Sequence, residues 1–182
     1  MWIILIILGV VVLWFIVAYN SFVRLVNRMK EAWSDIEVQL KRRYDLIPNL
    51  VESVKGYAKH ETGAFQAVTE ARAKALGAQS VHDKAVAENQ LSSALKSIFA
   101  VAEAYPQLRA VESFVQLQNE LADTENKIQA ARRFYNSNVL SLNTKIESFP
   151  SNLIAGIFKF KKAEFFDIDE KGVEGQPVAV KF

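Results

Sequence analysis

Two short clusters place paired arginines beside aromatic residues: RRYD at residues 42–45 and RRFYN at residues 132–136. Paired guanidinium groups can bind phosphates or a partner's carboxylates through several hydrogen bonds. Tyr44 and Tyr135, however, fall on the apolar stripes of predicted helices, and arginine stems often cover the edge of such a core. We therefore favour a structural role, with ion pairs to acids of neighbouring helices. The candidate residues for partner binding or structure are Arg42, Arg43, Tyr44, Pro48, Arg132, Arg133 and Tyr135.

Patterns typical of catalysis or metal binding are sparse. The segment KHETG around His60 begins like the H-E-x-x-H of zinc proteases but lacks the second histidine. Di-iron bundles need Glu-x-x-His, yet Tyr57 and Gln79 stand three residues before His60 and His82. Phosphate-binding glycine loops, nucleophile-elbow serines and cysteines are absent from the sequence. We expect no catalytic residue, no metal and no cofactor, in a protein that is not an enzyme.

An uncharged apolar stretch, Trp2 to Tyr19, opens the sequence. As a helix its eighteen residues rise about 27 Å, close to the hydrocarbon thickness of a bilayer. A signal peptide cleaved after Ala18 is an alternative, although no basic residue precedes the apolar run. A buried core helix is another, but such helices are rarely apolar on every face. We predict a retained single-pass anchor within residues 1–23.

Basic residues follow this stretch and none precedes it, which predicts an outside amino terminus and a cytoplasmic helical domain. Residues 24–60 hold eight basic and five acidic residues, so the excess positive charge lies where anionic headgroups attract it. Such a small excess is untypical of nucleic-acid-binding domains. We expect membrane lipid as a partner and no nucleic acid.

The first helix after the anchor carries apolar residues every three or four positions from Trp33 to Ala58. This stripe keeps its phase through Pro48, which indicates a kinked helix rather than a helix end. Because proline has no amide hydrogen, the kink leaves the carbonyl of Tyr44 without its usual partner.

Further helices are predicted along the rest of the chain. One ends near Gly77, and the next begins at a Ser80–Asp83 capping box and stops before Pro106. The last runs from Leu108 to Phe149 with apolar steps of about 3.4 residues, near coiled-coil spacing. Four asparagines of this last helix, including Asn143, are interpreted as residues that fix helix register.

The predicted fold class is all-α: an N-terminal transmembrane helix followed by an elongated antiparallel helical bundle of three to four long helices. We divide the chain into an anchor at 1–23, a helical bundle at 24–150 and a C-terminal tail at 151–182. The tail is first aromatic and basic, then polar.

The tail's destination depends on how often the chain reverses. A turn at GYAKHETGAF would return the last helix to the membrane, whereas a helix that continues through it would place the tail at the distal end. We favour the distal end, because this segment has no proline and glycine alone is tolerated within helices. The candidate residues for membrane-interface contact or assembly are Lys159, Phe160, Lys161 and Lys162.

Ordered blocks over nearly the whole chain resemble the LemA family of bacterial membrane proteins. They include RRYDLIPNLVESVKGYAKHE, AVAEAYPQLRA, FVQLQNELADTENKIQAARRFYN and IESFPSNLIAGIFKFKKAEFF. The resemblance implies an N-terminal membrane helix and an elongated helical domain, and it implies no established enzymatic activity and no catalytic residues.

Two functions follow as hypotheses. The first is a membrane-anchored helical scaffold that forms a homo-oligomer and organises membrane or envelope partners. The alternative is a regulatory adaptor that presents a protein partner to a membrane protease or kinase. In both, the protein partner is not identified by the sequence.

Overall fold

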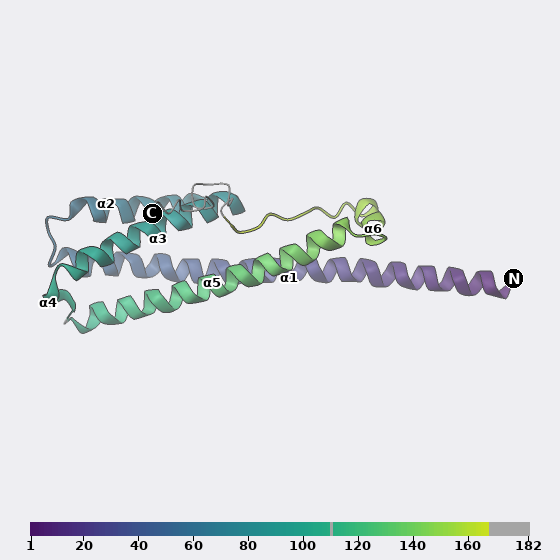
Figure 1. The fold of residues 1–182 in the computed structure, drawn as a ribbon, viewed down its shortest axis with the longest axis horizontal. Helices are drawn as coiled ribbons and strands as arrows, with labels where there is room; N and C mark the ends of the chain where they lie inside the picture. Colours follow the sequence, from purple (N-terminus) through teal and green to yellow (C-terminus); the bar gives the residue numbers. More distant parts are fainter. Residues whose placement is uncertain (110, 168–182) are drawn as a thin grey trace, which may run out of the picture. The chain divides into compact units, whose positions relative to one another are not determined.

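The computed structural model describes residues 1–109 and 111–167, and within these ranges the regular structure is entirely helical. The predicted all-α class with a long apolar N-terminal helix is confirmed. Figure 1 shows the helices α1 (Trp2–Lys55), α2 (Thr62–Gly77), α3 (Val81–Glu103), α4 (Pro106–Arg109), α5 (Glu112–Glu147) and α6 (Ser151–Ile157).

The chain divides into two compact units. Of the described residues, unit 1 contains 1–43 and 122–165, and unit 2 contains 44–121 with Phe166 and Asp167. Helices α1 and α5 each contribute residues to both units. Each unit is described below by itself.

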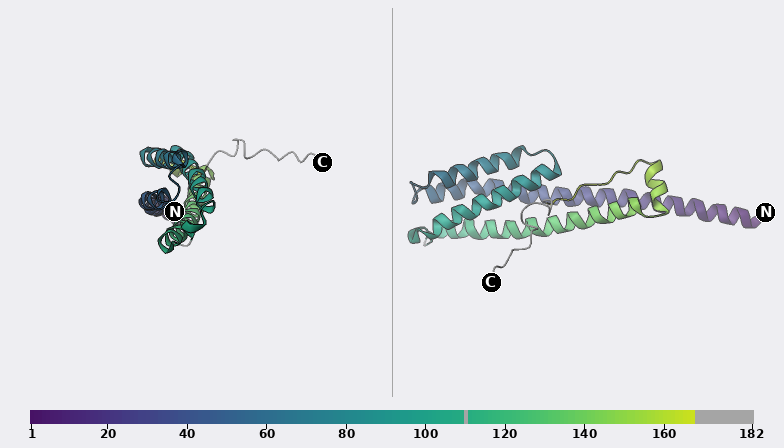
Figure 2. Two further views of the ribbon diagram at one scale, coloured as in Figure 1. Left: turned by 90° about the vertical axis from the view of Figure 1, so that its left-hand side faces the viewer. Right: turned by 45° about the horizontal axis from the view of Figure 1, so that its top comes forward.

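Unit 2 is built from four helical segments that alternate in direction: the end of α1, α2, α3 and the beginning of α5 (Figures 1 and 2). Apolar residues with the predicted spacing are buried in this unit, and the fully buried ones include Ile47, Val54, Val68, Leu91 and Ile98. The capping box is confirmed, because the Ser80 hydroxyl accepts a 3.0 Å hydrogen bond from the amide of Asp83. Helix α2 ends at Gly77, as expected.

Our expectation that the helix continues through GYAKHETGAF is wrong. Helix α1 ends at Lys55, and the amides of Tyr57 and Ala58 bond back to the carbonyl of Val54 at 3.0 and 2.9 Å. Ala58 is buried, so the chain reverses around an apolar contact before α2 begins at Thr62. Glycine in this segment therefore marks a turn and not a tolerated interruption.

At the other weak point α1 passes through Pro48 without ending, so the expectation that the proline does not end the helix is confirmed. The apolar stripe keeps its phase on both sides of the proline, and Leu40, Tyr44, Ile47 and Val51 are all buried. Tertiary packing of this face thus holds the helix together where one backbone hydrogen bond is missing.

Unit 1 pairs the remaining part of α1 with the remaining part of α5, which run in opposite directions (Figure 1). Ile36, Ile128 and Val139 are buried here, and confirm the predicted stripes. The predicted ends of the last helix are wrong by a few residues. Leu108 is buried but belongs to the short helix α4, and Phe149 lies beyond the end of α5 and is exposed.

Residues 151–165 of the tail also belong to unit 1, and the predicted distal position of this part is wrong. Ile154 and Ala155 of α6 form a buried cluster with Ala18 and Phe22 of α1 and Leu142 of α5. This part of the tail therefore lies beside the end of the apolar stretch of α1, whereas residues 168–182 of the predicted tail lie outside the described residues. The cause is the turn after Lys55, which adds one reversal to the path of the chain.

Candidate functional site

The first arginine cluster ties α1 to α5 within unit 1. Arg43 is only 4% exposed, and its guanidinium lies 3.2 Å from a carboxylate oxygen of Glu125. Arg42 is largely exposed and lies 3.6 Å from Asp123. The hydrogen bond from Lys127, 2.7 Å long, is the main cause that lowers the pKa of Asp123 from its usual value. These are the ion pairs with neighbouring helices that we expected.

Tyr44, the next residue, forms hydrogen bonds within unit 2 through both its side chain and its backbone carbonyl. Its hydroxyl donates to the buried carboxylate of Glu88 on α3. Its carbonyl, the one that Pro48 leaves without an amide partner, accepts a 2.8 Å hydrogen bond from Nε of Arg72 on α2. The backbone defect created by the proline is thus satisfied by a neighbouring helix.

The second cluster is divided between the core and the surface. Tyr135 is buried, its ring lies 5.4 Å from the ring of Trp33, and its hydroxyl donates a 3.0 Å hydrogen bond to the carbonyl of Glu164. Burial, assisted by the charge of Glu164, raises the pKa of Tyr135 above its usual value. Arg133 and Phe134 are exposed, so this part of the cluster remains accessible on the surface of α5.

An aromatic cluster joins the C-terminal segment to the end of the apolar stretch of α1. The ring of Phe158 lies 4.6 Å from that of Tyr19 and 5.8 Å from that of Phe15. The ring of Phe160 stacks on Phe22 at 4.7 Å. We call residues 149–163, which surround this contact, the collar.

Backbone geometry folds the collar back onto α1. Lys159 has φ = 57°, the left-handed conformation that commonly follows the last helical residue. The amide of Phe160 then bonds to the carbonyl of Ala155 at 2.9 Å, which is the six-to-one bond of a Schellman motif. This turn directs Phe160 toward Phe22.

Side chains of α5 hold the collar and the base of the apolar stretch. Asn143 accepts a hydrogen bond from the amide of Ala163 and donates one to its carbonyl, both 2.9 Å long. Lys145 donates to the hydroxyl of Ser21, and its ammonium lies 5.1 Å from the centre of the Phe22 ring. Burial is the main cause that lowers the pKa of Lys145, and the charge of Arg24 adds to it.

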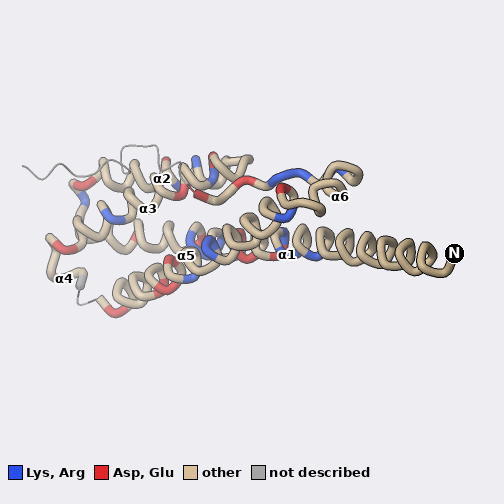
Figure 3. The backbone as a smooth tube through the Cα atoms, turned by 45° about the vertical axis from the view of Figure 1, so that its right-hand side comes forward, with Lys and Arg blue, Asp and Glu red and all other residues tan. Residues whose placement is uncertain are grey.

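The predicted interface residues meet in this collar. Phe160 is partly buried against Phe22, whereas Lys159, Lys161 and Lys162 are exposed. Lys162 forms an ion pair with Glu147. Figure 3 shows a stretch of basic residues in blue beside α6, and it shows the first part of α1 without charged residues.

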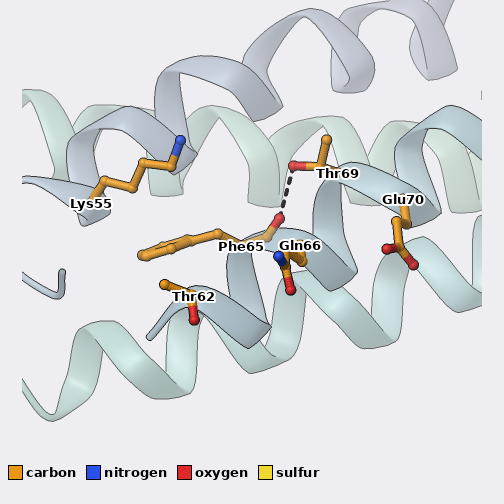
Figure 4. A pocket seen from close by; sticks show the side chains of 6 residues that line it. All are labelled: Lys55, Thr62, Phe65, Gln66, Thr69 and Glu70. Atoms are coloured by element: carbon orange, nitrogen blue, oxygen red, sulfur yellow. Dashed lines mark hydrogen bonds between the residues drawn. The ribbon is translucent and has the colours of Figure 1, made fainter. Parts of the chain in front are cut away.

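One surface depression lies on unit 2, beside the beginning of α2. It has a volume of about 410 Å³ and is lined in part by Lys55, Phe65 and Glu70, and Figure 4 shows Lys55 and Glu70 at opposite ends of it. The hydroxyl of Thr69 in this depression is bonded to the carbonyl of Phe65 at 2.8 Å. No group of three His, Asp or Glu side chains suited to a metal ion occurs within residues 1–109 and 111–167.

Two important side chains were not singled out from the sequence, Arg72 and Lys145. Arg72 lies four residues after Val68 and three before Ala75, so its position on a buried stripe was visible in the spacing. Lys145 lies three residues after the buried Leu142. A charged residue at a core position was the available signal in both cases.

Comparison with known proteins places the chain in a family. Magnetosome protein MamQ 2 of Paramagnetospirillum magneticum is 26% identical over 186 residues, covering 88% of this chain and 68% of that protein. Protein LemA of Metamycoplasma hominis is 29% identical over 160 residues, covering 82% of this chain and 73% of that protein. Residues 32–182 match the LemA family, which confirms the resemblance noted from the sequence blocks. The chain therefore belongs to the LemA family.

Proposed function

We propose that this protein is a membrane-anchored helical scaffold that organises membrane or envelope partners by self-association. The observation that carries the proposal is the continuity of α1. Within the part of the chain that the structure describes, α1 is the helix long and apolar enough to cross a membrane, and its apolar stretch is almost wholly exposed. It continues beyond residue 23 into the helical bundle without a loop.

A helix that leaves the bilayer without a flexible linker restricts the orientation of what it carries. Residues 24–43 of unit 1 follow the apolar stretch directly and contact α5 through the ion pair of Arg43 with Glu125 and the ring contact of Trp33 with Tyr135. A scaffold needs such a fixed orientation, because its copies must present matching surfaces to one another. By the distribution of basic residues, the bundle lies on the cytoplasmic side.

We place the self-association surface at Arg133 and Phe134 on α5. Phe134 is 52% exposed and lies next to an exposed arginine. Aromatic residues and arginine are enriched at protein interfaces, where they contribute much of the binding energy. A second copy of the chain is the partner that the scaffold hypothesis requires here. The relatives named magnetosome proteins are in line with a role in membrane organisation.

Mass photometry of the full-length protein, extracted from its own membrane in polymer nanodiscs, tests the proposal. We expect particles with two or more copies, and fewer copies per particle for the double variant Arg133→Glu/Phe134→Ser. Leu76→Ser is the matched control, because Leu76 is an equally exposed apolar residue on α2. Particles with one copy bound to one molecule of another protein would support the adaptor alternative and contradict the scaffold.

A further inference from the structure

The depth of the collar follows from its contacts with α1. Trp2 to Tyr19 rises about 27 Å, slightly less than the hydrocarbon thickness of a bilayer, so the whole stretch fits within the hydrocarbon. Phe15 lies four residues before Tyr19, about 6 Å inside the end of the stretch. Phe158 contacts both rings and therefore lies at the same depth. A residue at that depth is surrounded by lipid when α1 spans the bilayer.

Helix α6 has the surface that such a position requires. Its Ile154 and Ala155 are buried against α1 and α5, whereas Leu153, Ile157 and Phe158 are exposed on the outside. Ile157 is 65% exposed and Phe158 is 44% exposed. No charged residue occurs between Glu147 and Lys159, so the entire uncharged segment can enter an apolar environment. Apolar side chains exposed together next to an anchor are typical of membrane contact.

Basic residues begin where the uncharged segment ends. Lys159, Lys161 and Lys162 follow directly, in alternation with Phe160, which is held on Phe22. Two acids lie nearby in sequence: Glu147, which pairs with Lys162, and Glu164. The net charge of residues 147–164 is still positive, with three lysines against two glutamates. Exposed lysines at the edge of the hydrocarbon attract anionic headgroups.

We propose that the collar is a second membrane contact: α6 lies in the bilayer interface beside the transmembrane helix, with Leu153, Ile157 and Phe158 in the acyl region and Lys159 and Lys161 on anionic phospholipid headgroups. The occupant of this surface is the lipid bilayer, because the collar contacts residues of α1 that are themselves within the bilayer. The contact rests on the proposed anchoring by α1 and adds a lipid-binding site to it.

The consequence is a defined height of unit 1 above the membrane. A single transmembrane helix tilts to match the thickness of the bilayer, and packing against neighbouring helices helps to set that tilt. An interfacial helix clamped to α5 by Asn143 adds a second point of contact, so that α5 as well as α1 is connected to the membrane surface.

Depth-dependent quenching of the full-length protein in nanodiscs tests this contact, and the absence of native cysteine allows single labelling sites. A fluorophore is attached at Ile157→Cys, with acyl-brominated phosphatidylcholine as the quencher. Ile16→Cys on α1 is the control for the hydrocarbon. Val38→Cys is the control for water, because Val38 is 61% exposed and lies 19 residues beyond Tyr19 on the same helix, about 28 Å along its axis.

We expect the probe at Ile157 to be quenched at least about half as strongly as the one at Ile16, and several-fold more than the one at Val38. Quenching at Ile157 as weak as at Val38, with Ile16 strongly quenched, would overturn the collar contact and leave the anchor intact. If the emission of the probe at Ile157 is shifted to the blue but not quenched, protein and not lipid covers this face. That result also overturns the collar contact. Weak quenching at Ile16 would instead contradict the anchoring on which the proposal rests.

The headgroup contact has its own readout. At a constant fraction of brominated lipid, replacing unbrominated phosphatidylcholine by phosphatidylglycerol should increase quenching at Ile157. The double variant Lys159→Gln/Lys161→Gln should remove this increase. The matched control is Lys74→Gln/Lys96→Gln, which removes two exposed lysines of α2 and α3. In this control variant phosphatidylglycerol should still increase quenching at Ile157. If phosphatidylglycerol has the same effect on the probe with and without Lys159 and Lys161, the anionic headgroup contact is refuted.

Discussion

Replacing Arg72 by methionine should destabilise unit 2, because a backbone carbonyl of α1 loses its hydrogen-bond donor. Nε of Arg72 donates a 2.8 Å hydrogen bond to the carbonyl of Tyr44. This carbonyl has no amide partner within its own helix, because residue 48 is proline. Methionine keeps the apolar stem but has no donor. An acceptor left unsatisfied in a buried environment costs about 1–3 kcal/mol.

The proline supplies an internal control. In the Pro48→Ala variant, the new amide at position 48 can bond to the carbonyl of Tyr44 in the ordinary helical pattern. Pro48→Ala alone should be neutral or stabilising, because proline is about 3 kcal/mol less favourable than alanine in a helix interior. In that background Arg72→Met should cost about 1 kcal/mol or less. The double-mutant cycle should therefore give a coupling energy of about 1–2 kcal/mol between residues that share this one carbonyl.

Thermal and denaturant unfolding of the full-length protein in detergent, followed by far-UV circular dichroism, measures the cycle. Lys74→Met is the matched control on α2, because Lys74 is exposed, and it should change stability by less than about 0.5 kcal/mol. An equal cost of Arg72→Met with proline and with alanine at position 48 would refute the reasoning, since the energy would then come from another contact of the arginine.

Three further predictions concern α5. Leu121→Asp and Ile128→Asp should each lower stability by several kcal/mol, because a charge replaces a buried apolar side chain; melting curves like that of the parent would show that the core stripe is misassigned. Asn143→Ala should leave the helical content unchanged but release the collar, seen as faster amide hydrogen exchange in residues 158–163; unchanged exchange would show that the two 2.9 Å hydrogen bonds do not hold it. The pKa of Tyr135 is raised in the folded protein, so the unfolded chain ionises first as the pH rises. The contribution of Tyr135 to stability should therefore be fully present below pH 10, the usual tyrosine value, and should be lost as the pH rises through the folded-state pKa. Tyr135→Phe should remove this part of the alkaline loss, and an identical pH dependence of denaturation in parent and variant would contradict it.

Helix spacing predicted most of the core because burial follows the period of the helix. The stripe of α1 keeps its phase through Pro48, and Tyr44 and Ile47 are buried where the pattern puts them. The same spacing separates buried from exposed arginines. Arg43 lies three residues after Leu40 and faces inward, whereas Arg42 is exposed.

The destination of the tail could not be read in this way, because it depends on a turn that carries no strong sequence signal. Gly56 and Gly63 fit both a turn and a continuing helix, and the choice is made by the packing of Ala58. Asn143 was interpreted as a residue that fixes helix register, yet it binds the backbone of Ala163, twenty positions later. Contacts of this kind follow from the complete path of the chain and not from local periodicity.

Alkaline carbonate extraction of native membranes, with intact mass spectrometry of both fractions, tests the central claim most directly. The scaffold, its orientation and the collar all require that α1 stays in the membrane as a retained anchor. We expect the protein in the membrane pellet with Trp2 to Tyr19 still present. A soluble protein in the supernatant, or a mature chain that begins at Tyr19, would contradict it.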